Sequence, residues 1–172
     1  MHPLHKKLNF SIRPEISEEL NTQFIARYPQ IPSDYSTFLH SFSLLINHSD
    51  TTWFNSISDF NETNTESDFK WNEFEIMSIE AFEGDKEQQQ IIKEFWDKHL
   101  PIILSVKDGY AFFAIGVAEE NFGKVYFGIE PEFEEPELVA HSFDEFISLL
   151  LDQSLDTLLL NFIGQFSPHC NF

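Results

Sequence analysis

The feature that most constrains the fold is a series of apolar segments separated by turn signals in the second half of the chain. Residues 101–106 read PIILSV and residues 110–118 read YAFFAIGVA, and the Asp-Gly pair at 108–109 between them is a hairpin signal. A third apolar segment, KVYFGI at 124–129, follows the turn-like EENFG. Strands joined by such short turns are antiparallel, because parallel strands need crossovers of a dozen or more residues. The sequence therefore predicts a β-meander.

Apolar side chains at helical spacing predict helices before the meander. Ile16, Leu20, Phe24 and Tyr28 recur at steps of four residues after Pro14, which suits a helix start. Two further segments show the same kind of periodicity behind an N-terminal capping residue. The predicted helices are Pro14–Tyr28, Ile31–Ile46 with Ser33 or Asp34 as its cap, and the segment that runs from the cap Asp85 to His99.

Shorter segments between these helices are predicted as strands and loops. Trp53 and Phe54 are expected in a short strand, and the alternation of apolar and polar residues in Trp71–Ile79 also favours a strand. Asn47–Thr52 and the polar stretch 58–68 are predicted to be loops.

The chain after the meander begins with an acidic segment and ends in helices. Glu130–Glu137 is expected to be a loop, and Leu138–Ala140 a last short strand. Ser142 is predicted to open a helix, with Glu145 completing a capping box. A final helix is expected at about 155–166. Because strands cluster instead of alternating with helices, the fold class predicted is α+β, a mainly antiparallel sheet flanked by helices.

The length and the aromatic content predict one domain. The chain has 172 residues, within the usual domain range of roughly 100–200. Its 20 phenylalanines can each bury about 150–250 Å². We expect a single domain over 1–172, with a core at about 14–152 and a C-terminal helical extension at 153–172.

The charge of the chain limits the classes of partner. There are 29 acidic and 10 basic residues, which give a formal net charge of −19. Such a surface repels phosphate backbones and anionic lipids, so direct binding of nucleic acid or membrane is not expected. A basic protein partner would be attracted. Solubility alone is the other interpretation of this charge.

Cysteine content and hydropathy indicate a cytoplasmic location. Cys170 is the only cysteine, so no internal disulfide forms, as expected in a reducing compartment. The N-terminal residues lack an apolar signal-peptide core, and no stretch reaches the roughly 18 apolar residues of a membrane span.

No motif of catalysis, cofactor binding or metal binding is present in the sequence. There is no HExxH, GxSxG, P-loop or GxGxxG, and six glycines leave little for a phosphate cradle. His99 lies on an apolar stripe and is interpreted as a structural helix-end histidine. We therefore predict no catalytic, cofactor or metal residues and no enzyme activity. A carboxylate pair acting on a small substrate stays open as an alternative, because 29 acidic residues bring some together by chance.

Three stretches in order resemble the SUKH superfamily, the Smi/Knr-like group. IPSDYSTFLHSF at 31–42 resembles its Leu-Pro-x-Asp-Tyr-x-x-Phe-Leu helix start. FWDKHLPIILSVKDGYAFFAIG at 95–116 resembles its Trp-x-x-x-x-Leu-Pro-Ile strand and aspartate-glycine turn. GKVYFGI at 123–129 and HSFDEFISLLL at 141–151 resemble its Gly-x-Val-Tyr strand and closing Ser-Phe-x-x-Phe helix. The chain departs from the group in SFSLLINHS at 41–49, where many members carry an Asn-Gly-Gly turn.

The resemblance implies a SUKH-like fold and a protein-binding function. Bacterial members are similar to immunity proteins that bind and neutralise a cognate polymorphic toxin, often a nuclease with a basic substrate surface. The alternative is an intracellular scaffold or regulator with no toxin partner, as the group's fungal cell-wall regulator implies. The matching residues cap helices and turn hairpins, so they indicate a scaffold and not an active site.

The acidic strip, defined as Glu130–Glu137, is the candidate contact surface for a basic partner. Its five glutamates lie within eight residues, beside the predicted capped helix. Phe133 is the one aromatic in the strip, and it either anchors the partner or folds the loop back onto the core. The predicted partner-binding residues are Glu130, Glu132, Phe133, Glu134, Glu135 and Glu137.

Overall fold

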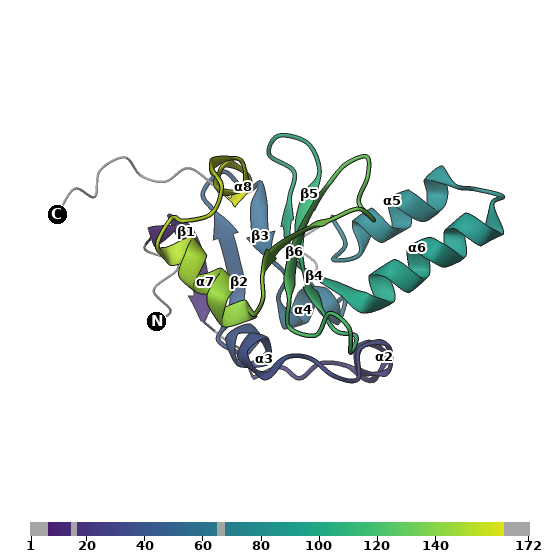
Figure 1. The fold of residues 1–172 in the computed structure, drawn as a ribbon. Helices are drawn as coiled ribbons and strands as arrows, with labels where there is room; N and C mark the ends of the chain where they lie inside the picture. Colours follow the sequence, from purple (N-terminus) through teal and green to yellow (C-terminus); the bar gives the residue numbers. More distant parts are fainter. Residues whose placement is uncertain (1–6, 15–16, 65–67, 164–172) are drawn as a thin grey trace.

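A computed structural model describes residues 7–14, 17–64 and 68–163 of the chain. Its centre is an open, seven-stranded antiparallel sheet in which the strands follow one another in sequence order, β1 to β7 (Figure 1). The predicted α+β class with an antiparallel meander is confirmed, and the meander extends to the N-terminal strands as well. The strands are β1 (Phe10–Pro14), β2 (Phe42–Asn47), β3 (Thr52–Phe54), β4 (His99–Ser105), β5 (Ala111–Gly116), β6 (Val125–Ile129) and β7 (Glu137–Ala140).

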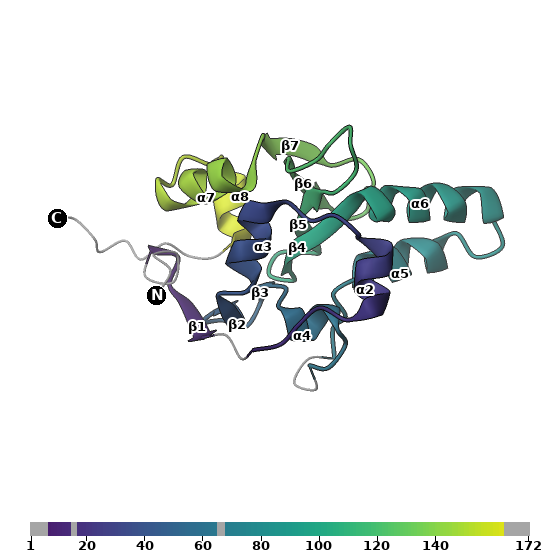
Figure 2. The same cartoon turned by 90° about the horizontal axis from the view of Figure 1, so that it is seen from below.

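The helices divide between the two faces of the sheet. Figures 1 and 2 show α5 and α6 as an antiparallel pair that extends from one side of the molecule, whereas α3, α7 and α8 lie on the other side. The helices are α2 (Thr22–Arg27), α3 (Ser33–Leu39), α4 (Ile57–Phe60), α5 (Glu73–Ala81), α6 (Lys86–Lys98), α7 (Phe143–Leu151) and α8 (Thr157–Ile163).

The strand register assigns alternate residues to two cores. One row of paired residues lies in the main core with helices α3, α7 and α8; it consists of Leu45, Phe54, Ile103, Phe113 and Phe127. The neighbouring row lies on the opposite face, which α5 and α6 cover only in part; it consists of Ser11, Ile46, Trp53, Leu104, Phe112 and Gly128. Of this second row, Leu104 and Phe112 are buried with Trp96 of α6 in a smaller core. The sheet is therefore packed fully on one face and partly on the other.

The C-terminal helix α8 belongs to the main core. Leu160, Phe162 and Ile163 are buried there. The carbonyl oxygen of Phe162 accepts hydrogen bonds from the hydroxyls of Thr52 (2.7 Å) and Ser105 (3.1 Å) in the sheet. The predicted C-terminal helix is thus present from Thr157 to Ile163, and its predicted end at about residue 166 lies outside the described residues.

Several predicted elements are confirmed with their caps. Helix α6 begins after Asp85, whose carboxylate accepts from the Gln88 N–H at 3.0 Å. Helix α7 begins after Ser142, whose hydroxyl accepts from the Glu145 N–H at 3.1 Å. The second bond of the predicted capping box is displaced by one residue. The Glu145 carboxylate accepts from the N–H of His141 at 2.7 Å, whereas a capping box would use the N–H of the N-cap residue, Ser142.

The helix predicted over Pro14–Tyr28 is wrong in most of its length. Pro14 ends strand β1, and the only helix described in this stretch is the short α2. The cap of α2 explains its late start, because the Asn21 side chain accepts from the Phe24 N–H and the Asn61 side chain accepts from the Asn21 N–H, both at 2.8 Å. A contact distant in sequence therefore overrides the local periodicity.

The helix predicted over Ile31–Ile46 is also wrong in its second half. Helix α3 ends at Leu39, and strand β2 begins at Phe42. The predicted cap is wrong as well, because Pro32 occupies the N-cap position and makes no side-chain cap bond. A continuous apolar run such as FSLLI fits a buried strand as well as a helix.

The strand predicted over Trp71–Ile79 is a helix, α5. Phe74 and Ser78 are buried four residues apart, so the same residues that alternate along the sequence also form one helical face. Part of the loop predicted at 58–68 is helical too. Helix α4 includes the buried Phe60 and begins with a capping box between Ser56 and Asp59.

Candidate functional site

The acidic strip connects β6 to β7 and folds over the smaller core. Phe133, at its centre, is only 4% exposed. Its ring stacks on Phe74 of α5, with the ring centroids 4.7 Å apart and an angle of 14° between the planes. Phe133 therefore fixes the loop to α5 and offers no exposed aromatic surface to a partner. The loop also packs closely over Gly128, where an added Cβ would overlap the ring of Phe112 and lie 3.2 Å from the Phe133 carbonyl oxygen.

Two glutamates of the strip are held by hydrogen bonds to the body of the protein. The Glu134 carboxylate accepts from the indole N–H of Trp96 at 3.0 Å, so the half-buried Glu134 is tied to α6. The Glu130 carboxylate accepts from the N–H of Tyr110 at 3.1 Å, at the turn between β4 and β5. Anchoring at both sites reduces the entropy that the loop would lose on binding a partner.

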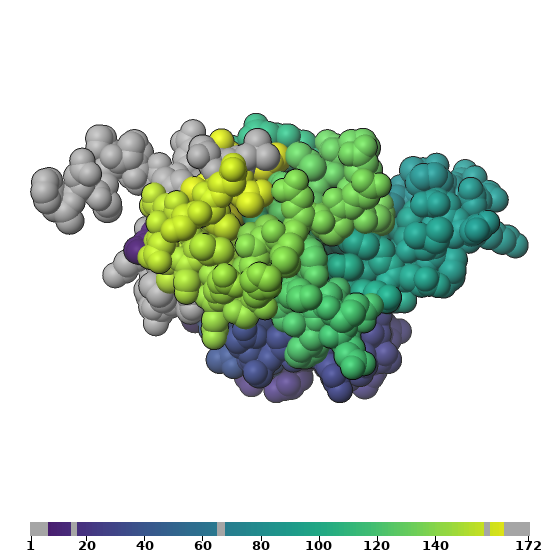
Figure 3. Space-filling model, viewed as in Figure 1, coloured from purple at the N-terminus to yellow at the C-terminus, as the bar shows by residue number. Residues whose placement is uncertain are grey.

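Four of the predicted contact glutamates are exposed, and one of them is Glu130, although its carboxylate is tied to Tyr110. Glu132, Glu135 and Glu137 are exposed, and Glu137 is the first residue of the edge strand β7. The Glu135 N–H donates to the Glu132 carbonyl at 3.1 Å, which makes a turn that carries both side chains. The strip thus combines a buried aromatic anchor with exposed carboxylates. Figure 3 shows this β6–β7 region in green on the face of the molecule, next to the teal α5–α6 pair.

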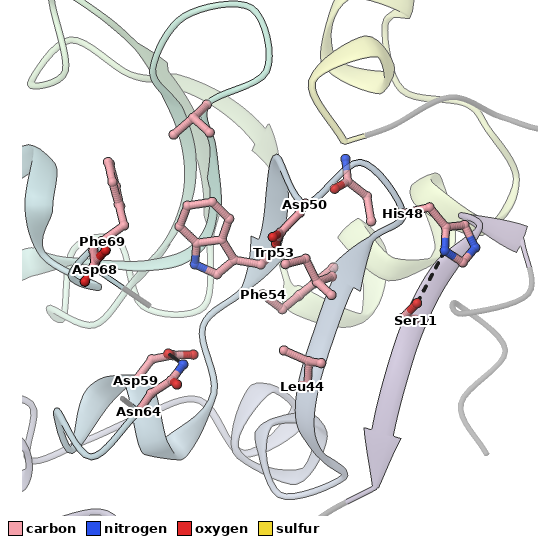
Figure 4. Close-up of a pocket in the computed structure, with 13 residues that line it drawn as sticks. Ser11, Leu44, His48, Asp50, Trp53, Phe54, Asp59, Asn64, Asp68 and Phe69 are labelled. Carbon is pink, nitrogen blue, oxygen red and sulfur yellow. Dashed lines mark hydrogen bonds between the residues drawn. The ribbon is translucent and has the colours of Figure 1, made fainter. Parts of the chain in front are cut away.

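A second candidate site is a cavity on the part of the sheet that α5 and α6 leave uncovered. We call it the sheet cavity, and its volume is about 720 Å³. Trp53 of β3 lies at its centre, with Leu44 of β2 on one side and Phe69 on the other (Figure 4). Its lining is completed by Ser11, Ile46, Asn47, His48, Asp50, Phe54, Asp59, Asn64, Asp68 and Val106.

The rim of the sheet cavity is acidic. Asp50 and Asp68 are exposed, and Asp59 is half-buried. The Asp59 carboxylate is already engaged, because it accepts from the Ser56 N–H (2.8 Å) and from the Asn64 amide (2.6 Å). Asp50 adopts a positive φ of 57°, a conformation that aspartate and asparagine tolerate better than most residues.

A line of aromatic rings joins the sheet cavity to the acidic strip. Trp53 contacts Phe69 (5.5 Å between ring centroids), Phe69 contacts Phe74 (5.7 Å), and Phe74 stacks on Phe133. The two acidic features therefore lie on the same side of the sheet, and packed rings connect them without a break.

A buried ion pair, also absent from the sequence predictions, joins α2 to α5. The Arg27 guanidinium donates to both oxygens of Glu75 at 2.8 Å and to Asp97 at 2.8 Å. Burial lowers the pKa of Arg27, but the hydrogen bonds to Glu75 and Asp97 and the nearby negative charges outweigh burial, so the net pKa is raised. The guanidinium also lies over the Tyr28 ring at 5.2 Å. These contacts satisfy every charge in the cluster, so we interpret it as structural.

His99, the C-cap histidine of α6, also has a structural role. His99 packs against Phe95 and Asn121, as expected of a helix-end histidine. Within the residues described above, no group of three or more His, Cys, Asp or Glu side chains is placed to hold a metal ion. The same residues include no helix that is long and apolar enough to cross a membrane.

The sequence predicts the acidic strip as a contact surface, a prediction that stays open, and it gives no indication of the sheet cavity. Most of the lining residues come from β1, β2, β3, the turn between β2 and β3 and the segment before α5, and strand β1 itself was not predicted. The one residue in the sequence that could have indicated the cavity is Trp53. It neighbours Phe54 in a three-residue strand, so the two aromatic side chains lie on opposite faces of the sheet. No pattern in the sequence indicated that its face would stay uncovered.

The comparisons with known proteins identify a family. The sequence model of a family described as "SMI1 / KNR4 family (SUKH-1)" matches residues 15–149, which is most of the chain. No curated protein and no solved structure gives a significant match. The matched segment includes both the sheet cavity's β2–β3 residues and the whole acidic strip.

Proposed function

Because the chain belongs to the SMI1 / KNR4 family (SUKH-1), we propose that it is a bacterial immunity-type protein that neutralises a cognate toxin by binding it. The partner is a basic toxin domain of the nuclease class, and binding takes place in the cytoplasm. The protein acts by occupying the toxin's substrate surface and performs no catalysis itself. The observation that carries this proposal is an anchored strip of exposed glutamates on a protein with net charge −19.

Charge supports the proposal through the kinetics of association. A nuclease needs a basic surface to bind phosphates, and a strongly acidic protein is attracted to that surface over distances of about a Debye length, ~8–10 Å in physiological salt. Complementary charge raises association rates above the roughly 10⁵–10⁶ M⁻¹s⁻¹ of neutral pairs. Speed matters here, because a toxin must be bound before it acts.

The anchoring of the strip supports the proposal through affinity. Phe133 and Glu134 hold the loop against α5 and α6. The exposed glutamates of the strip are therefore presented in one arrangement, as negative charges that could replace substrate phosphates. A preorganised surface loses less entropy on binding than a flexible acidic tail of the same charge.

The test is rescue from toxicity. The C-terminal domain encoded by the gene immediately upstream is expressed with and without this protein, and growth and copurification are followed. We expect growth to be restored and a stable complex to be recovered. A harmless upstream domain, or toxicity with neither rescue nor a complex, would contradict the proposal and direct attention to the alternative, a Smi/Knr-type scaffold without a toxin partner.

The contribution of the strip is measured with charge-neutral variants. The triple variant E132Q/E135Q/E137Q is expected to slow association at least about tenfold at low ionic strength and to flatten its salt dependence. The matched control is E80Q/E83Q/E87Q, which removes the same charge from exposed positions around the α5–α6 turn. Both should fold normally, as circular dichroism would show. Equal association rates for the two variants would exclude the strip as the interface.

A further inference from the structure

We propose that the sheet cavity receives a basic segment of the partner protein, with an arginine or lysine side chain lying over Trp53 between Asp50 and Asp68. This inference rests on the proposed function, because it assumes that the partner is a basic toxin domain. It assigns to the complex a second contact point that is separate from the acidic strip.

The shape of the cavity suits an inserted side chain. Its volume of about 720 Å³ falls within the roughly 300–1,000 Å³ of typical binding pockets. The floor is apolar and partly aromatic, with Leu44, Ile46 and Trp53 contributed by two adjacent strands and Phe69 closing one side. Aromatic floors of this kind are enriched at the centres of protein interfaces.

The charge of the cavity selects a cation. Asp50 and Asp68 are exposed on opposite sides of Trp53 (Figure 4), and none of the described lining residues is Lys or Arg. Arg13 shares this face of β1, two residues beyond Ser11, but is not part of the lining. A guanidinium over an indole ring gains a cation–π attraction, and the flanking carboxylates add charge-assisted hydrogen bonds.

Continuity with the acidic strip indicates a polypeptide as the occupant. The rings from Trp53 through Phe69 and Phe74 to Phe133 place the two acidic features on one side of the sheet. These rings are largely buried, so they fix the positions of the strip and the cavity relative to each other, and a basic domain that contacts the strip approaches the same side of the sheet as the cavity. A partner that contacts both points also gains affinity from the second contact, which becomes intramolecular once the first has formed.

The experiment uses Trp53 as a reporter inside the cavity. The full-length protein is labelled with 5-fluorotryptophan and studied by ¹⁹F NMR, so that tryptophans of the toxin domain stay invisible. Trp96 and Trp71 are 1% and 8% exposed, and Trp53 is the most accessible of the three. The W53F variant identifies its resonance. Addition of the upstream toxin domain should shift the Trp53 signal and reduce its broadening by a neutral gadolinium complex at least about twofold.

The charge of the rim is tested in parallel by affinity. D50N/D68N should raise the Kd of the complex about tenfold at low salt, whereas the control E83Q/E87Q should change it less than twofold. Asparagine suits the positive φ of residue 50, so the variant should keep its fold.

The outcomes distinguish a failure of this inference from a failure of the proposed function. A complex that forms without a change at Trp53, and with equal affinities for D50N/D68N and its control, would overturn the cavity assignment and leave the proposed function intact. A Trp53 signal already shielded in the free protein would show that the chain's own residues fill the cavity, which also overturns the assignment. Failure of the wild-type protein to form any complex would overturn both.

Discussion

At the scale of single residues, His99 shows how neighbours set the protonation of one side chain. Its Nδ1 lies 2.8 Å from the carbonyl oxygen of Phe95, which can only accept, so Nδ1 carries the proton. Nε2 therefore accepts from the Asn121 amide at 3.2 Å. Burial lowers the pKa of His99, and the positive charge of Lys98 acts in the same direction, against the raising effects of the Phe95 carbonyl and Glu120. The neutral ring thus packs against Phe95 of α6 and Tyr126 of β6.

This depressed pKa predicts acid sensitivity. Below the unfolded-state pKa of about 6.5, the unfolded chain binds a proton that folded His99 resists, so stability falls as the pH drops through this window. The urea midpoint of unfolding should therefore fall between pH 7.5 and pH 5.5, and the fall should be larger for the wild type than for H99Q. The comparison cancels the effects of the other histidines, which both proteins share. Identical pH dependence of the two proteins would contradict the role assigned to His99.

At the scale of elements, contacts distant in sequence determine the helices around the sheet. Helix α2 has six residues and would not persist alone, since isolated helices shorter than about 12–15 residues are marginal in water. The bidentate pair between Arg27 and Glu75 ties it to α5, and it supplies the buried Glu75 carboxylate with a charged partner. The same pair explains why α5 carries a glutamate on its inner side.

Breaking this pair should destabilise the fold through Glu75. R27M leaves the carboxylate, 9% exposed, without its partner, and should cost about 3 kcal/mol of unfolding free energy. The double variant R27M/E75Q should be more stable than R27M alone, because it removes the unpaired charge. Urea unfolding of the wild type, R27M, E75Q and R27M/E75Q gives the four unfolding free energies of a double-mutant cycle. Additive effects of the two substitutions would show that the pair is not coupled.

At the scale of the whole molecule, the excess of negative charge has two opposite consequences for salt. The net charge is −19, so the carboxylates of the compact state repel one another, and salt screens this repulsion. The attraction of the same charge to a basic partner is screened as well.

Raising NaCl from 20 to 300 mM should therefore stabilise the free protein and weaken its complex. The urea midpoint of the free protein should increase, and the association rate with the toxin domain should fall at least about tenfold. Both are measured on the same preparation, with E132Q/E135Q/E137Q as the control whose association should respond less. A salt-independent association rate would contradict an electrostatic interface.

Much of the second half of the fold could be predicted from sequence. The hairpin at Asp108, the caps Asp85 and Ser142 and the strands of the meander depend on neighbouring residues, and each was found where expected. The first half was predicted less well. There the pattern of apolar residues fits a helix and a strand about equally, as in Trp71–Ile79, and the choice depends on what covers each face.

The sequence by itself determined the meander, the caps of α6 and α7, the family resemblance and the negative charge, because each depends on local sequence patterns or on composition. Only the tertiary structure decided that Phe133 is buried and that Trp53 lines an open cavity. Both outcomes depend on where α5 and α6 lie on the sheet, since they cover Leu104 and Phe112 and leave the neighbouring strands exposed. That placement is set by packing between segments distant in sequence, which no local pattern records.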